Sequence, residues 1–110
     1  MKVAIFGKNV SETVIPYIQE LFDELHDLNA VAVVYKPFFE SLSGKITFQR
    51  QPDLFITQAD IEQKVDFLFS IGGDGTILDA VGLVGDSGIP VTGINTVSYT
   101  HLTLPTKRIV

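Results

Sequence analysis

The chain has 110 residues, enough for one modest domain and too few for two independent hydrophobic cores. Hydrophobic residues make up 45% of it and charged residues 19%, a composition that excludes intrinsic disorder and predicts a buried core. Thirteen acidic against eight basic side chains argue against binding to nucleic acid, and the absence of cysteine excludes disulfides, thiolate nucleophiles and cysteine-based zinc sites.

The sequence shows neither a membrane-spanning segment nor a signal peptide. No window approaches the ~20 consecutive apolar residues that a membrane-spanning helix needs. The first apolar run, Val3 to Phe6, stops at Gly7 and lacks a small-residue cleavage site. We therefore expect a cytoplasmic protein that does not associate with membranes.

The first elements alternate between strand and helix. Residues 3–6 and 30–35 are continuous apolar runs, typical of strands that are buried on both faces of a parallel sheet. Between them, apolar residues recur every three or four positions over residues 14–28, which predicts an amphipathic helix. A short helix is predicted from Pro37 to Leu42.

The start of the long helix is decided by its capping residue. Ser11 and Thr13 both have side chains that can cap a helix. We favour Thr13, because it places Pro16 in the first turn, where proline removes no helical hydrogen bond.

The second half continues the alternation after an unpatterned stretch. Residues 46–60 mix polar and apolar side chains without a period, so we interpret them as an irregular connection. A single helical turn is predicted at 60–63, a third strand at 65–71, a helix over the apolar face of 77–84 and a fourth strand at 90–94. This order predicts an α/β fold with a doubly wound, mostly parallel sheet.

The sequence Gly72-Gly73-Asp74-Gly75-Thr76 joins the third strand to the next helix, at the carboxyl edge of the sheet, where doubly wound folds bind ligands. The glycines permit a sharp turn and a close approach of a ligand, while Thr76 and the first helical amides offer hydrogen-bond donors to an anion. The spacing matches neither a Walker A loop nor the dinucleotide-binding fingerprint.

Asp74 is an unusual residue beside a phosphate. A carboxylate there repels the phosphate unless it accepts a proton from a hydroxyl group or helps to hold a magnesium ion. This favours transfer of a phosphoryl group to an alcohol. The alternative is a plain Gly-Asp-Gly turn in which Asp74 caps the helix.

The residues from Phe67 to Leu78, together with those from Ile89 to Thr96, resemble the N-terminal domain of the NAD kinases. Gly-Gly-Asp-Gly-Thr alone is shared with diacylglycerol and sphingosine kinases, whereas the later Pro-Val-x-Gly-Ile-Asn block favours NAD kinase. The resemblance covers residues 1–96 and implies a Rossmann-like, phosphofructokinase-like N-terminal domain. It also implies a β-rich C-terminal domain, which we expect to be missing from this chain.

The resemblance implies ATP-dependent phosphorylation of the 2′-hydroxyl of the adenosine ribose of NAD, with Mg²⁺ and by a homo-oligomer. Asp74 matches the residue that accepts the hydroxyl proton, and no residue is matched to a metal ligand. The residues that it places at NAD and the phosphates are Gly72, Gly73, Asp74 itself, Gly75 and Thr76, with Asn95 near the nucleotide cleft. The alternatives are a lipid kinase of the diacylglycerol or sphingosine type and a non-catalytic nucleotide-binding fragment.

Residues 97–110 depart from the family pattern, which continues with Gly-x-Leu-Gly-Phe-Leu. All thirteen acidic residues precede this segment, and its formal charge comes from Lys107 and Arg108. Its first six residues, Val-Ser-Tyr-Thr-His-Leu, resemble a transposon-end sequencing adapter translated in frame. We therefore interpret 97–110 as a non-native tail on a fragment that is inactive alone. The alternative is a natural strand containing the alternating Leu102 and Leu104.

Three further residues are weaker candidates for the same edge of the sheet. Lys8 and Asn9 follow the first strand, where they either contact phosphate or form a plain turn. Asp79 lies on the helix after the glycine turn and either approaches the ligand or faces solvent. His26 has no partner spaced with it, so we assign it to the surface of the long helix.

Overall fold

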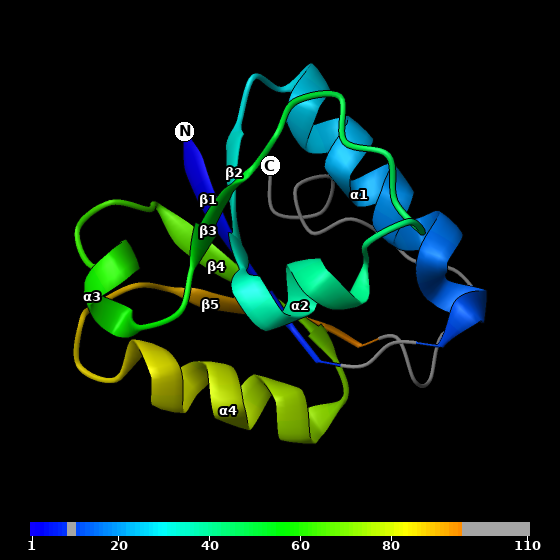
Figure 1. Ribbon diagram of the computed structural model, residues 1–110. Helices are drawn as coiled ribbons and strands as arrows, with labels where there is room; N and C mark the ends of the chain where they lie inside the picture. Colours follow the sequence, from blue (N-terminus) through cyan, green and yellow to red (C-terminus); the bar gives the residue numbers. More distant parts are fainter. Residues whose placement is uncertain (9–10, 96–110) are drawn as a thin grey trace.

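The computed structural model describes residues 1–8 and 11–95, and Figure 1 shows its arrangement. Its elements, in chain order, are β1 (Lys2–Gly7), the 3₁₀ helix η1 (Glu12–Val14), α1 (Ile15–Asp27), β2 (Val31–Tyr35), α2 (Lys36–Ser41), β3 (Asp53–Phe55), α3 (Gln58–Ile61), β4 (Phe67–Gly72), α4 (Asp74–Val84) and β5 (Val91–Asn95). The described strands form one sheet in the order β3-β2-β1-β4-β5, and every pair is parallel. The predicted α/β fold is confirmed.

Helices cover both faces of the sheet, with α1 and α2 on one side and α3 and α4 on the other (Figure 1). Successive residues of a strand point to opposite faces. Val3 and Ile5 of β1 therefore pack with α1 and α2, whereas Ala4 and Phe6 pack with α3 and α4. Because both faces are buried, the central strands are continuous apolar runs.

The long helix α1 buries a stripe of Ile18, Leu21, Phe22 and Leu25 against the sheet, as its periodicity predicts. The prediction that Thr13 caps it is wrong. Thr13 lies inside η1, and α1 begins at Ile15 with Pro16 in its first turn. The hydroxyl groups of Ser11 and Thr13 hydrogen-bond each other at 2.8 Å, so neither caps a backbone amide.

The interpretation of 46–60 as an irregular connection holds for residues 46–52, which form neither helix nor strand. It is wrong for Asp53–Phe55, which forms the edge strand β3 in register with Val33–Tyr35 of β2. The segment before it is fixed on α1 by Gln19. The Gln19 side chain donates to the Thr47 carbonyl and accepts from the Thr47 N–H, both at 2.8 Å. Residues 46–52 are therefore an ordered connection into β3, a strand that the sequence pattern does not predict.

The remaining elements agree with the predictions to within a few residues. The single helical turn predicted at 60–63 is α3, which begins at Gln58, because Thr57 and Asp60 form a capping box. The tail predicted at 97–110 lies outside the described residues. Within residues 1–8 and 11–95, no helix combines the length and apolarity required to cross a membrane.

Candidate functional site

The strand order creates a switch point between β1 and β4. From β1 the chain proceeds to β2 and β3 on one side of the sheet, and then returns to add β4 and β5 on the other side. In open α/β sheets, ligands bind outside the carboxyl ends of the strands at such a point. The residues that leave these ends are Lys8, after β1, and the glycine turn between β4 and α4.

Gly72 is required by the turn itself. Its φ of +149° lies in a region that side chains rarely adopt, and an added Cβ would stand 2.6 Å from the Thr76 Oγ1 and 2.9 Å from the Thr76 Cβ. The chain then reverses through Gly73, which occupies the N-cap position of α4. The fold therefore accounts for glycine at position 72 without a ligand.

Gly75 has a different environment. It lies exposed in the first turn of α4, and an added Cβ would meet no atom within 4 Å. Glycine in a helix costs about 0.5–1 kcal/mol relative to alanine, so the fold gives no reason for its presence. Gly82 further along α4 has equally open surroundings. The location of Gly75 at the switch point is therefore what associates it with ligand binding.

The first turn of α4 uses part of the donor set that the sequence predicts for an anion. The N–H of Thr76 donates to the Gly73 carbonyl at 3.1 Å, and the N–H of Ile77 donates to the same oxygen at 3.3 Å. The Thr76 amide is therefore occupied, and its hydroxyl remains as a donor close to Gly72. The helix N-terminus still places positive partial charge at this edge.

The second sequence block ends beside the first. In the pairing of β4 with β5, Gly72 is level with Asn95, and Asp74 is the first residue of α4. An added Cβ on Gly93 would stand 2.5 Å from the Ile77 Cδ1, so a glycine in β5 is what lets α4 lie close to the sheet. The backbone thus brings both blocks to one edge.

An ion pair connects the switch point to α4. The Lys8 ammonium pairs with the Asp79 carboxylate, and the two side chains are 57% and 47% exposed. At such exposure a pair contributes about 0–1 kcal/mol to stability. The sequence indicates that both residues belong near this edge, but their pairing follows from the adjacency of β1 and β4, which periodicity does not encode.

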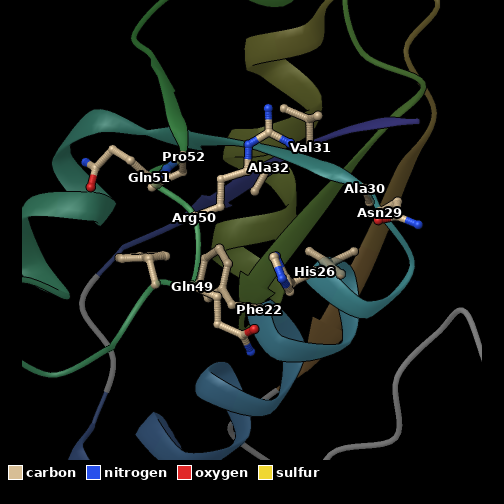
Figure 2. A pocket seen from close by; sticks show the side chains of 12 residues that line it. Phe22, His26, Asn29, Ala30, Val31, Ala32, Gln49, Arg50, Gln51 and Pro52 are labelled. Atoms are coloured by element: carbon tan, nitrogen blue, oxygen red, sulfur yellow. The ribbon is translucent and has the colours of Figure 1, made fainter.

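A hollow of about 70 Å³ lies elsewhere, between the end of α1, the start of β2 and residues 48–52 (Figure 2). Arg50 reaches over Ala32 toward Val31, while His26 and Phe22 lie on its other side. This position is at the amino end of β2, and no predicted site residue lines it. We therefore take the switch point as the candidate site, because the residues with relevant chemistry converge there.

The described residues contain no group of three or more His, Asp or Glu side chains able to hold a metal ion by themselves. A magnesium ion commonly keeps several waters and binds through one or two carboxylates together with substrate phosphates. A magnesium ion carried by the phosphates of a ligand would need no such group of side chains.

Fold and site together define an open parallel α/β domain with a glycine-rich strand-to-helix turn at its switch point. The chain matches the family described as the ATP-NAD kinase N-terminal domain over residues 3–108, and it belongs to that family. It is 36% identical over 95 residues to the NAD kinase of Flavobacterium psychrophilum, covering 86% of this chain and 32% of that protein.

Two further relatives are also NAD kinases, and the chain matches a similar share of each. The NAD kinase of Flavobacterium johnsoniae is 34% identical over 95 residues, which cover 86% of this chain and 32% of that protein. The NAD kinase of Bacteroides fragilis is 34% identical over 96 residues, which cover 87% of this chain and 32% of that protein. The chain therefore spans about a third of the length of the relatives that it matches.

Proposed function

We propose that the chain is the N-terminal domain of an NAD kinase, which transfers the γ-phosphoryl group of ATP to the 2′-hydroxyl of the adenosine ribose of NAD and yields NADP. The observation that carries this proposal is the position of the Gly-Gly-Asp-Gly-Thr turn at the switch point of a chain that belongs to the NAD kinase family.

In this proposal Asp74 accepts the proton of the 2′-hydroxyl as the hydroxyl oxygen bonds to the γ-phosphorus. The bond from that phosphorus to the bridging oxygen of ADP breaks, and ADP leaves with the electron pair. General-base assistance contributes about 10²- to 10⁴-fold, so positioning and charge neutralisation supply most of the acceleration. Mg²⁺ bound to ATP would offset negative charge on the phosphates.

The other residues at the turn position the substrates. The exposed Gly75 leaves room for NAD and the phosphates at the start of α4. Thr76 offers its hydroxyl group to a phosphate oxygen, and Gly73 shapes the turn. Asn95 is level with Gly72 in the sheet, and we assign it to the nucleotide cleft. Family membership also supports a homo-oligomeric, cytoplasmic enzyme when full length.

The test uses a full-length enzyme that carries this chain as its N-terminal domain. It is incubated with Mg²⁺, ATP and either NAD or diacylglycerol, and NADP and phosphorylated lipid are measured. We expect NADP with the wild type. In Asp74→Asn we expect turnover to fall at least about 10²-fold, while NAD binding measured by calorimetry is retained.

Asp86→Asn provides the matched control, since Asp86 carries the same charge but follows the far end of α4. It should leave turnover unchanged. Phosphate on the lipid and not on NAD would identify the alternative lipid kinase. Binding of NAD and ATP without any turnover would identify a non-catalytic nucleotide-binding protein, and undiminished NADP formation by Asp74→Asn would reject the role of Asp74.

A further inference from the structure

Lys8 emerges next to the glycine turn. In the pairing of β1 with β4, Gly7 is level with Ile71, so Lys8, the first residue after β1, lies beside Gly72, the last residue of β4. This is the switch point of the fold. The first residue after β1 therefore borders the nucleotide site that we propose.

Lys8 is one of two basic residues that directly follow the carboxyl ends of neighbouring strands here, since Lys36 follows β2. On the side of the glycine turn, the described elements β4, α4 and β5 contain neither lysine nor arginine, so Lys8 is the cation nearest to the turn along the sheet. Asp79 adds a negative charge to α4. A nucleotide brings several further negative charges, which a nearby ammonium group would offset.

The partner of Lys8 can be exchanged for another anion. The Lys8–Asp79 pair is about half exposed on both sides, so water screens it and no core contact depends on it. A phosphate carries more charge than a carboxylate and more oxygen atoms that accept hydrogen bonds from an ammonium group. The ammonium group can therefore leave Asp79 for a phosphate oxygen without disturbing the fold.

We propose that Lys8 is a phosphate-binding residue of the nucleotide site, and that Asp79 holds its ammonium group beside the turn until a nucleotide phosphate replaces the carboxylate. This inference rests on the proposed function and deepens it, because it adds to the site a cation that lies outside the glycine turn.

The test measures binding of inorganic tripolyphosphate and of ATP to the 110-residue chain by calorimetry, at low and moderate salt. Tripolyphosphate lacks base and ribose, so it reports on phosphate recognition alone. The variants are Lys8→Met, Lys8→Arg and Asp79→Asn. Lys45→Met is the matched control, because Lys45 forms an exposed pair with Glu12 at 3.3 Å on the α1 face of the sheet, opposite the face that α4 covers. Circular dichroism and urea unfolding confirm that each variant folds.

We expect Lys8→Met to weaken tripolyphosphate binding at least about tenfold and to reduce its salt dependence, as expected for loss of a charge-assisted hydrogen bond. Lys8→Arg should stay within about threefold of the wild type, because it keeps the charge. Asp79→Asn should strengthen binding about two- to fivefold, because the competing carboxylate is gone. Lys45→Met should have no effect.

The proposal is overturned if Lys8→Met binds as the wild type does, if Lys45→Met weakens binding equally, if Asp79→Asn weakens it, or if the wild-type chain binds no tripolyphosphate. Failure of the proposed function gives a different result. Lys8-dependent binding of tripolyphosphate with no NADP from the full-length enzyme would reject the activity and retain this site. NADP formation by the full-length enzyme, together with unaltered phosphate binding in Lys8→Met, would support the activity and reject Lys8 as a phosphate-binding residue.

Discussion

At the scale of single residues, the glycines near the switch point have different physical causes. An added Cβ on Gly72 or Gly93 would approach Thr76 or Ile77 more closely than van der Waals contact allows, so packing excludes a side chain at both positions. Around Gly75 the space is open. Within the Gly-Gly-Asp-Gly-Thr turn, packing therefore requires glycine at position 72 but not at position 75.

Gly75 and Gly82 offer a matched pair of substitutions within α4. Both are exposed, and neither has the positive φ that would strain alanine. Alanine at each position should leave the free energy of unfolding unchanged or raise it, by up to about 1 kcal/mol, in urea denaturation. Only Gly75→Ala should weaken ATP binding in calorimetry, by at least about tenfold, because its methyl group would occupy space next to the ligand. Equal ATP affinities in the two variants would contradict a ligand-related role for Gly75.

Gly72 and Gly44 provide a second comparison, in which backbone strain is common to both. Gly44 has a φ of +78° and open surroundings, whereas Gly72 combines a φ of +149° with close contact to Thr76. Gly44→Ala should lower the free energy of unfolding by about 1 kcal/mol. Gly72→Ala should lose more, about 2–3 kcal/mol, because steric overlap is added to strain. Urea unfolding followed by circular dichroism measures both, and an equal or larger loss in Gly44→Ala would disprove the steric contribution.

At the scale of elements, α3 depends on one carboxylate. The N–H groups of Thr57 and Ile56 donate to Asp60 Oδ2 at 3.0 and 2.9 Å, and these bonds, that of Thr57 first, hold the pKa of Asp60 below its ordinary 3.8. A depressed pKa means that the ionised form stabilises the fold above the unfolded pKa, and that this contribution is lost as the pH falls through the lower, folded pKa.

Asp60→Asn should therefore reduce the difference in stability between neutral and strongly acidic pH. We expect urea unfolding of the wild type to lose stability below about pH 4 to a greater degree than unfolding of Asp60→Asn does. Asp86→Asn makes the same change of charge outside the capping box of α3. Its stability should vary with pH as that of the wild type does. Parallel stability curves for the wild type and Asp60→Asn would show that the cap contributes nothing to the pH dependence.

Elements that are long enough to show a repeating pattern of apolar residues can be predicted from the sequence. Elements that form only because they pair with a segment distant in the sequence cannot. The buried strands and the amphipathic α1 follow from hydrophobic spacing. In β3, by contrast, Asp53 and Leu54 are exposed and only Phe55 is buried, so three residues give no pattern. Pairing with β2 decides that segment. Likewise, the 3₁₀ turn η1 precedes α1, and Ser11 and Thr13 hydrogen-bond each other there, which residue spacing does not indicate.

At the scale of the whole molecule, the sequence predicts at which end of the sheet the candidate site lies, but it does not predict all the residues that meet there. A glycine turn after a buried strand must lie at the carboxyl end of a parallel sheet, which is where Gly72 and Asn95 meet. The adjacency of β1 and β4 depends on the order of the strands, which local patterns do not encode. The pairing of Lys8 with Asp79 is a consequence of that order.

The two ends of the parallel strands offer two different places where a nucleotide could bind. The hollow at the amino end of β2 is lined by Phe22, His26 and Arg50, and the turn at the carboxyl end begins at Gly72. When ATP is titrated into the ¹⁵N-labelled chain, we expect the largest amide shifts between Gly72 and Ile77, because a bound phosphate polarises the amides nearest to it. Amides that line the hollow should stay unchanged. The reverse distribution would place the nucleotide in the hollow. The roles proposed for the residues of the turn would then have to be withdrawn, since the length of the sheet separates the amino end of β2 from the carboxyl end of β4.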